Sequence, residues 1–117
     1  MGDIEFRQAI ATRKYTFVPR TGRRYGVTVS IGKPYSRGRP AQWLCPYRIA
    51  GGRKSKVFAM AGVDSMQALL LATQILRVEL EYWARKEKGR FLYDGKAELF
   101  LPDLRTAKGK GPRGNAA

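Results

Sequence analysis

The sequence predicts an α+β fold, in which an antiparallel sheet of about four strands packs on one long helix and is followed by a C-terminal β-hairpin and a disordered basic tail. Apolar residues recur at helical spacing over residues 64–88, while shorter stretches alternate apolar with polar residues, as half-buried strands do. Pro and Gly clusters separate these stretches. With 117 residues, the chain has the length of one domain. We assign residues 1–104 to that domain and residues 105–117 to the tail.

The long helix has a recognisable beginning and end. Asp64 can accept hydrogen bonds from the first free backbone N–H groups, and Gln67, three positions later, can reach back, which is the capping-box arrangement. Lys86 and Lys88 lie where the helix dipole favours cations, and Gly89 can take the left-handed conformation that ends many helices. The first half of the helix is apolar on nearly all sides, so it has to be covered on more than one side.

Four stretches before the helix are predicted to be extended. They are Asp3–Thr12, Tyr25–Ile31, Gln42–Ala50 and Val57–Ala61. Proline cannot donate a backbone hydrogen bond, so Pro46 in the third of these has to face an edge or a bulge, and we expect an edge strand. The segment Arg13–Arg24 combines a short extended piece, Tyr15–Val18, with a turn at Pro19–Gly22, and is expected to be an exposed basic loop or hairpin tip. Gly32–Pro40 is expected to be a basic loop, and Gly51 with Gly52 forms a hairpin turn.

The segment after the helix is predicted to form a hairpin, in which Arg90–Tyr93 and Ala97–Leu101 flank the turn dipeptide Asp94 and Gly95. A helix of about 24 residues extends roughly 36 Å, whereas a six-residue strand spans roughly 20 Å. The end of the helix therefore projects beyond a small sheet. We expect the hairpin to cover it, either in its own subunit or in a partner's.

The composition excludes several kinds of active site. The chain has no histidine and one cysteine, Cys45, which rules out an internal disulfide, the usual zinc sites and the commonest general base. Cys45 alternates with Trp43 and Tyr47, so we interpret it as a small buried hydrophobic residue. We predict no catalytic residue, no metal and no cofactor. No segment is apolar enough to span a membrane and no signal peptide is recognisable, so a cytoplasmic protein is expected.

Charge is distributed unevenly along the chain. The 23 Lys and Arg residues outnumber the 9 Asp and Glu residues, which gives a net charge of +14. Residues 1–63 carry +11, residues 64–104 carry −1 and residues 105–117 carry +4. Nine cations on three loops are the candidate nucleic-acid-binding residues. They are Arg20, Arg23 and Arg24 on the first loop, Lys33, Arg37 and Arg39 on the second, and Arg53, Lys54 and Lys56 on the third.

These three loops are expected to bring their cations together on the side of the sheet away from the long helix. Neighbouring strands are only about 5 Å apart, so charges on adjacent turns combine into one surface. Depending on strand order, the first and third loops can lie at the same end of the sheet.

Two segments resemble the paired signature of a family of short uncharacterised bacterial proteins. Residues 43–49 (WLCPYRI) fit the pattern W-x-C-P-aromatic-x-I, and residues 62–69 (GVDSMQAL) fit G-x-D-S-x-Q-A-L. The resemblance covers roughly residues 25–85. It implies a small strand-rich domain with one long helix. It assigns no catalytic residue, because the family has no settled activity.

The charge distribution favours a non-enzymatic nucleic-acid-binding protein that contacts DNA or RNA mainly at the phosphate backbone, through the basic loops and the tail. No helix-turn-helix, zinc-finger or RNA-recognition signature is present, so base-specific readout is not predicted. The alternative is a homodimeric protein-interaction or assembly module that dimerises through the long helix and the C-terminal hairpin and binds an acidic protein. A third hypothesis is a histidine-free enzyme that acts on a phosphorylated or anionic substrate.

Overall fold

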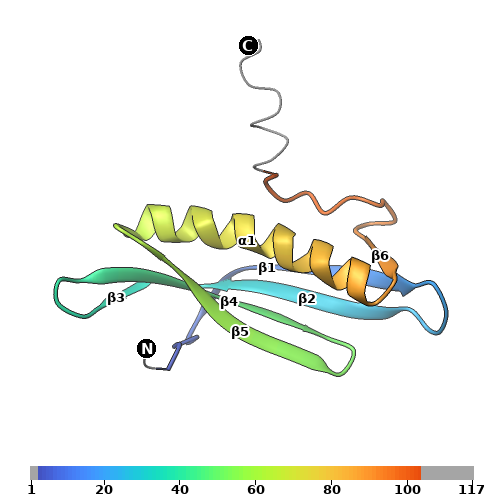
Figure 1. Ribbon diagram of the computed structural model, residues 1–117, viewed down its shortest axis with the longest axis horizontal. Coiled ribbons are helices and arrows are strands. Elements are labelled where there is room, and N and C mark those ends of the chain that lie inside the picture. Colours follow the sequence, from blue (N-terminus) through green and yellow to red (C-terminus); the bar gives the residue numbers. More distant parts are fainter. Residues whose placement is uncertain (1–2, 104–117) are drawn as a thin grey trace, which may run out of the picture.

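The structure, a computed structural model, describes residues 3–103, and within them it contains six strands and one helix (Figure 1). The elements are β1 (Ala9–Pro19), β2 (Tyr25–Gly32), β3 (Tyr35–Arg37), β4 (Gln42–Gly51), β5 (Lys54–Gly62), α1 (Ser65–Lys86) and β6 (Gly89–Leu92). The antiparallel sheet curls around α1, which lies along one of its faces. This confirms the α+β fold, with six strands instead of about four. The predicted basic tail lies outside the described residues.

Strand β4 is in the interior of the sheet. It pairs with β2 over residues 47–51 and with β3 over residues 42–44 on one edge, while β5 pairs with its other edge over residues 43–51. Strands β2 and β3 therefore follow one another along the same edge of β4, and β1 and β6 continue the sheet beyond β2. The prediction that Pro46 marks an edge strand is wrong. On the edge shared by β2 and β3, Pro46 falls between the two pairings, so its missing N–H costs no hydrogen bond on that side.

The hydrophobic core lies between α1 and the face of the sheet that it covers. Alternate residues of three neighbouring strands supply one side of it: Tyr15 and Phe17 of β1, Val27, Val29 and Ile31 of β2, and Cys45, Tyr47 and Ile49 of β4. The helix supplies Ala68, Ala72, Leu76 and Leu80, whose spacing of four residues places them on one face. Cys45 is fully buried among these side chains, as predicted.

The N-terminus of α1 is capped by side chains. The Gln67 backbone N–H donates to the Asp64 carboxylate at 2.8 Å, and the Val63 N–H donates to the Gln67 side chain at 2.7 Å. The predicted cap at Asp64 is confirmed, although Gln67 reaches one residue further back than in a capping box.

The chain turns directly from α1 onto the edge of β1. Lys88, not the expected Gly89, takes the left-handed conformation, with φ at 54°. Gly89 is required for another reason: a Cβ at this position would lie 2.4 Å from the Val18 carbonyl oxygen. This close approach lets β6 pair with residues 16–19 of β1.

The N-terminal region differs from the expected half-buried strand over Asp3–Thr12. Residues 3–8 have no regular structure, and β1 begins at Ala9. The preceding segment crosses the outer face of the sheet, where the Phe6 ring lies under the Arg48 guanidinium at 4.2 Å. It is held by a hydrogen bond from the Lys33 N–H to the Gln8 carbonyl at 2.9 Å. Gln8 interrupts the alternation of apolar residues, which explains why the strand does not start earlier.

Most of the predicted basic loop at Arg13–Arg24 belongs to β1, which continues to Pro19. The basic composition conceals a two-sided strand, because Arg13 shares the inner face with Tyr15 and Phe17. Its guanidinium is only partly exposed there. It donates to the carbonyl oxygens of Leu99 and Phe100, at 3.1 and 2.6 Å. Only residues 20–24 remain as the loop between β1 and β2.

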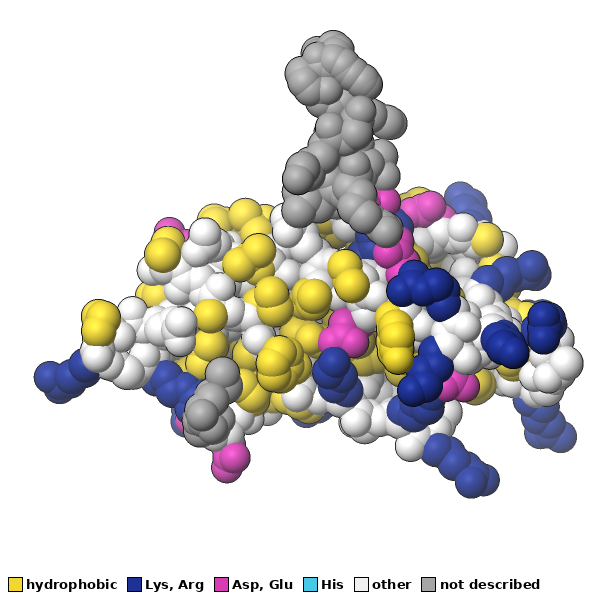
Figure 2. All heavy atoms as spheres, viewed as in Figure 1, with side chains coloured by type: hydrophobic (Ala, Val, Ile, Leu, Met, Phe, Trp, Pro, Cys, Tyr) yellow, Lys and Arg dark blue, Asp and Glu magenta, His cyan; other side chains and the backbone are white. Residues whose placement is uncertain are grey.

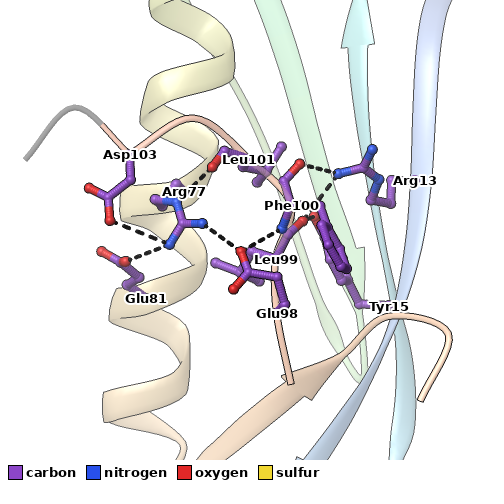
Figure 3. Close-up of polar contacts among 9 residues, drawn as sticks. All are labelled: Arg13, Tyr15, Arg77, Glu81, Glu98, Leu99, Phe100, Leu101 and Asp103. Atoms are coloured by element: carbon purple, nitrogen blue, oxygen red, sulfur yellow. Dashed lines mark hydrogen bonds and ion pairs between the residues drawn. The ribbon is translucent and has the colours of Figure 1, made fainter. Parts of the chain in front are cut away.

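The predicted C-terminal hairpin is reduced to a turn with a single bridge between Tyr93 and Lys96, because the first of its two strands pairs with β1 instead. Residues 97–103 have no strand structure and cross over the helix of their own subunit (Figure 3). Leu99 and Leu101 pack against the core, so this segment covers the helix around Arg77. It does not provide the expected cover for Tyr82, which is 54% exposed. Arg77 of α1 fixes it by donating to the Leu101 carbonyl at 3.0 Å and to Glu98 at 3.1 Å.

Candidate nucleic-acid interface

The first and third candidate loops lie at the same end of the sheet. Strand β1 pairs with β2 so that Phe17 lies opposite Tyr25, and β2 pairs with β4 so that Val27 lies opposite Gly51. The loop between β1 and β2 and the turn between β4 and β5 are therefore adjacent. This places Arg20, Arg23, Arg24, Arg53 and Lys54 together, with Lys56 two residues along β5.

The second loop is at the opposite end. Arg37 pairs with Gln42 at the far end of β4, and Arg37 and Arg39 line an open recess together with Gly62 and Val63 at the start of the helix. Lys33 lies between β2 and β3. The nine predicted cations thus do not converge within one copy of the chain. Two groups come together, and the third is separated from them by the length of the sheet (Figure 1).

Four further cations join the first and third loops, and sequence reasoning missed them. They are Arg85, Lys86, Lys88 and Arg90, at the C-terminus of α1 and the start of β6. The Arg20 backbone N–H donates to the Lys88 carbonyl at 2.7 Å, which fixes the first loop against the end of the helix. Arg20, Arg85, Lys88 and Arg90 line an open recess of about 650 Å³.

These cations form a surface at one end of the molecule, which we call the basic end: Arg20, Arg23, Arg24, Arg53, Arg85, Lys86, Lys88 and Arg90. Figure 2 shows Lys and Arg side chains gathered on the right, where Figure 1 places the β1–β2 loop and the end of α1. The prediction that the cations lie on the side of the sheet away from the long helix is wrong, because the C-terminus of the helix is part of the basic end. The C-terminal dipole of α1 is compatible with this excess of positive charge.

The cations of the basic end are not neutralised by the acidic side chains that the structure describes. None of the eight forms an ion pair with an Asp or Glu among residues 3–103. The two lysines of the third loop differ, since Lys54 pairs with Glu87, and Lys56 pairs with Glu79 at 2.6 Å. Arg53 is therefore the member of that loop whose charge is available to a ligand.

A signal for the missed residues was present in the sequence. Residues 85–90 contain four cations and one acid, but the larger segment 64–104 carries −1 because its other acids offset them. Lys86 and Lys88 were interpreted only as partners of the helix dipole. The charge of a long segment thus concealed a local cluster at its end.

Two groups with chemistry of their own, Cys45 and Tyr47, are buried in the core. Burial raises the pKa of the Cys45 thiol to about 11, so the thiol is protonated at neutral pH. Burial and the hydrogen bond to Glu79 raise the pKa of Tyr47. Over residues 3–103, no three His, Cys, Asp or Glu side chains lie close enough together to hold a metal ion.

One family comparison matches the chain. The sequence profile of a domain of unknown function, DUF6968, matches residues 11–102. The chain belongs to this family. The DUF6968 match extends further in both directions than the expected 25–85 and includes both signature segments.

The DUF6968 domain has no match among curated proteins, and none among solved structures. No helix in the described part of the domain is both long and apolar enough to cross a membrane. Its function has to be argued from its own surface.

Proposed function

We propose that this DUF6968 domain is a non-enzymatic nucleic-acid-binding protein that holds the phosphate backbone at its basic end and needs no cofactor. The observation that carries the proposal is the group of eight cations, from two loops and the end of α1, that share one end of the molecule without acidic partners among the described residues. A phosphate chain would supply the missing partners.

The chemistry of the basic end suits phosphates. Six of its eight cations are arginines, four of them in the two connecting turns, and a guanidinium can donate two parallel hydrogen bonds to one phosphate. Each phosphate that a Lys or Arg side chain neutralises releases the counterions condensed on the nucleic acid. Each such contact therefore adds affinity at low salt. With five to eight phosphate contacts, log K would fall against log salt with a slope of about −4 to −7 on duplex DNA. Such binding depends on shape and charge and is insensitive to base sequence.

The test is fluorescence anisotropy with a labelled DNA duplex and a labelled single strand, measured across about 50 to 200 mM salt. The triple variant Arg23→Gln, Arg24→Gln and Arg53→Gln is expected to bind more weakly, with a slope shallower by about 3. The matched control, Arg7→Gln, Lys14→Gln and Lys96→Gln, removes the same charge away from the basic end and should change the slope little. Wild-type binding that is absent at low salt, or that ignores salt, would refute the proposal.

A second candidate is an assembly module that binds an acidic protein. The observation in its favour is the exposed apolar surface beside β5, where Phe58 and Tyr82 are accessible to a second copy of the chain. In such an assembly the unpaired cations of the basic end would face the acidic protein. The discriminating measurement is competition: excess poly-glutamate should displace the labelled duplex only at much higher charge concentration if the site is built for nucleic acid. Displacement at equal charge concentration favours the acidic protein.

A further inference from the structure

We propose that a second copy of this chain docks on the face formed by β5 and α1, through antiparallel pairing of the two β5 edges around Phe58. The apolar residues of this surface, the β5 face, are Phe58, Met60, Leu71, Ile75, Val78 and Tyr82. The dimer is an inference beyond the binding activity proposed above, and it can be tested without nucleic acid.

The β5 face exposes large apolar side chains that no residue of the range 3–103 covers. Phe58 is 45% exposed, Val78 is 51% exposed and Tyr82 is 54% exposed. Phe58 lies opposite Tyr47 in the sheet, on the same face as the helix, and belongs to the outermost strand, along the side of α1. Beside it lies a shallow groove of about 230 Å³, which is lined by Met60, Leu71, Ile75 and Val78 and closed on the far side by Gln74, Arg77 and the C-terminal residues Pro102 and Asp103. Figure 2 shows hydrophobic side chains running across the middle of this view. An apolar surface of this kind marks a protein contact.

Strand β5 also has a free edge. It pairs with β4 in nine consecutive positions without a bulge, and no other strand among residues 3–103 pairs with it. Its backbone N–H and C=O groups on the outer side are therefore open to another strand. It contains no proline, and its two lysines, Lys54 and Lys56, both lie in its first half. The second half offers no such obstacle to pairing.

Charge decides which partner can occupy this face. Two copies that each carry +14 repel one another except where the local charge is balanced. Along β5 it is balanced, because Lys54 pairs with Glu87 and Lys56 pairs with Glu79 across the gap between strand and helix. The unpaired Lys86 lies over the Tyr82 ring, where the β5 face borders the basic end. An acidic partner would find unpaired cations at the basic end and not here. A second copy of the chain fits this neutral, apolar surface.

The register of the contact follows from symmetry. In an antiparallel pairing with the two-fold axis at Phe58, a residue n positions before Phe58 in one copy lies opposite the residue n positions after Phe58 in the other. Lys54 then faces Gly62 of the second copy, and Lys56 faces Met60, so no lysine meets a lysine. Phe58 meets its own counterpart on the axis, and aromatic pairs across strands stabilise such contacts.

The available area matches what a stable dimer needs. The 22 residues of α1 extend about 33 Å, and the helix together with the neighbouring strand is roughly 20 Å wide. The resulting area of about 700 Å² per copy is close to the roughly 800 Å² per partner of a standard interface.

The same arrangement would complete the basic surface, a consequence that rests on the proposed function. Antiparallel pairing sets Arg53 and Lys54 of one copy beside Gly62 of the other, and Arg37 and Arg39 line the recess next to Gly62. The second loop of one copy then lies about 10 Å, two strand spacings, from the third loop of the other. The three loops that are separated within one copy would meet between two copies.

Sedimentation of the full-length chain tests the contact. The wild type should sediment as a dimer, and Phe58→Glu should sediment as a monomer at the same concentration, because it places two carboxylates on the axis. Val78→Glu provides a second disruption at an exposed helical position. Leu70→Glu is the matched control, an exposed leucine on α1 outside the β5 face, and should leave the dimer intact. A monomeric wild type, or a dimer that survives both Phe58→Glu and Val78→Glu, would overturn the proposal.

Crosslinking tests the register. Directly opposed residues of antiparallel strands have Cα atoms about 4.5 to 5.5 Å apart, within the range of a disulfide. Phe58→Cys should therefore form an intermolecular disulfide on mild oxidation, whereas the control Leu70→Cys should not. Cys45 is fully buried and does not compete. A dimeric Phe58→Cys protein that does not crosslink would refute pairing around Phe58.

Nucleic-acid binding by the same variants separates this inference from the proposed function. Replacing Lys33, Arg37 and Arg39 with Gln should make the salt slope shallower in the dimer but leave it unchanged in a Phe58→Glu background. A monomeric wild type that binds DNA would refute the dimer and support the proposed function. A dimeric wild type that does not bind nucleic acid would support the dimer and refute the proposed function.

Discussion

The Tyr47 hydroxyl on β4 donates a hydrogen bond of 2.6 Å to the Glu79 carboxylate on α1. Lys56 on β5 donates to the same oxygen, also at 2.6 Å. The Tyr47 side chain is otherwise fully buried. One carboxylate thus links the helix to two adjacent strands at the border between the core and the β5 face, and it accounts for the polar groups that the core encloses there.

Tyr47→Phe tests the strength of this link. It removes a hydrogen bond to a charged group while keeping the ring, so we expect the free energy of unfolding to fall by about 1 to 3 kcal/mol. Urea unfolding followed by circular dichroism measures the change. Tyr93→Phe, at an exposed tyrosine, is the control and should alter stability by less than about 0.5 kcal/mol. Equal losses in the two variants would show that the bond to Glu79 contributes nothing.

Stability should decline in alkaline solution because of Cys45. Burial raises the pKa of its thiol from 9.0 to about 11 in the folded protein. The unfolded chain therefore loses this proton first as pH rises. The contribution is fully present below pH 9 and is lost progressively up to about pH 11, by roughly 2 to 3 kcal/mol.

Cys45→Ala isolates this contribution. Burial also raises the pKa of Tyr15 and Tyr47, which adds a decline above pH 10 with the same sign, but both tyrosines remain in the variant. The difference between the unfolding free energies of wild type and variant should therefore shrink between pH 9 and about 11. A difference that stays constant with pH would show that the thiol ionises equally in both states.

Arg77 is expected to hold the C-terminal segment in place. It is 14% exposed and contacts Glu81 at 3.2 Å, Glu98 at 3.1 Å and the Leu101 carbonyl at 3.0 Å (Figure 3). Arg77→Met should lower the free energy of unfolding by about 1 to 3 kcal/mol and speed amide exchange over residues 98–103. Arg85→Met, on the same helix, removes an arginine without such contacts. Exchange that is unchanged in Arg77→Met would mean that apolar packing alone holds the segment.

The helix could be predicted from sequence because its signals are local. Asp64 and Gln67 lie three residues apart, and the buried alanines and leucines follow a spacing of four. The interior position of β4 could not be predicted, because it depends on where β2 is interrupted, and that is a matter of pairing between distant segments. Pro46 by itself therefore indicated an edge that does not exist. The extent of β1 was concealed by Arg13, whose charge is satisfied by carbonyls near residue 100.

The candidate site was only partly predictable for a related reason. Loop positions could be read from glycines and prolines, but which loops share an end of the sheet follows from strand order. To predict that the C-terminus of α1 lies at the same end, one has to know where α1 ends relative to the β1–β2 loop. The backbone hydrogen bond from Arg20 to Lys88 shows that the two are in contact. No local pattern encodes this contact.

Gly62 should tolerate no side chain, because it is where β5 meets the start of α1. A Cβ at this position would lie 2.6 Å from the Ala68 nitrogen, and backbone atoms of a capped helix cannot move aside without loss of packing. Gly62→Ala is expected to lower the free energy of unfolding by about 1 to 3 kcal/mol. Gly26→Ala is the matched control within the sheet, since its Cβ would meet the flexible end of Lys14 at 3.2 Å. Urea unfolding should show a loss below about 0.5 kcal/mol for that control. If both variants were equally stable, the helix would have to be free to shift away from β5, and the buried alanines at its start would not be in tight contact with the sheet.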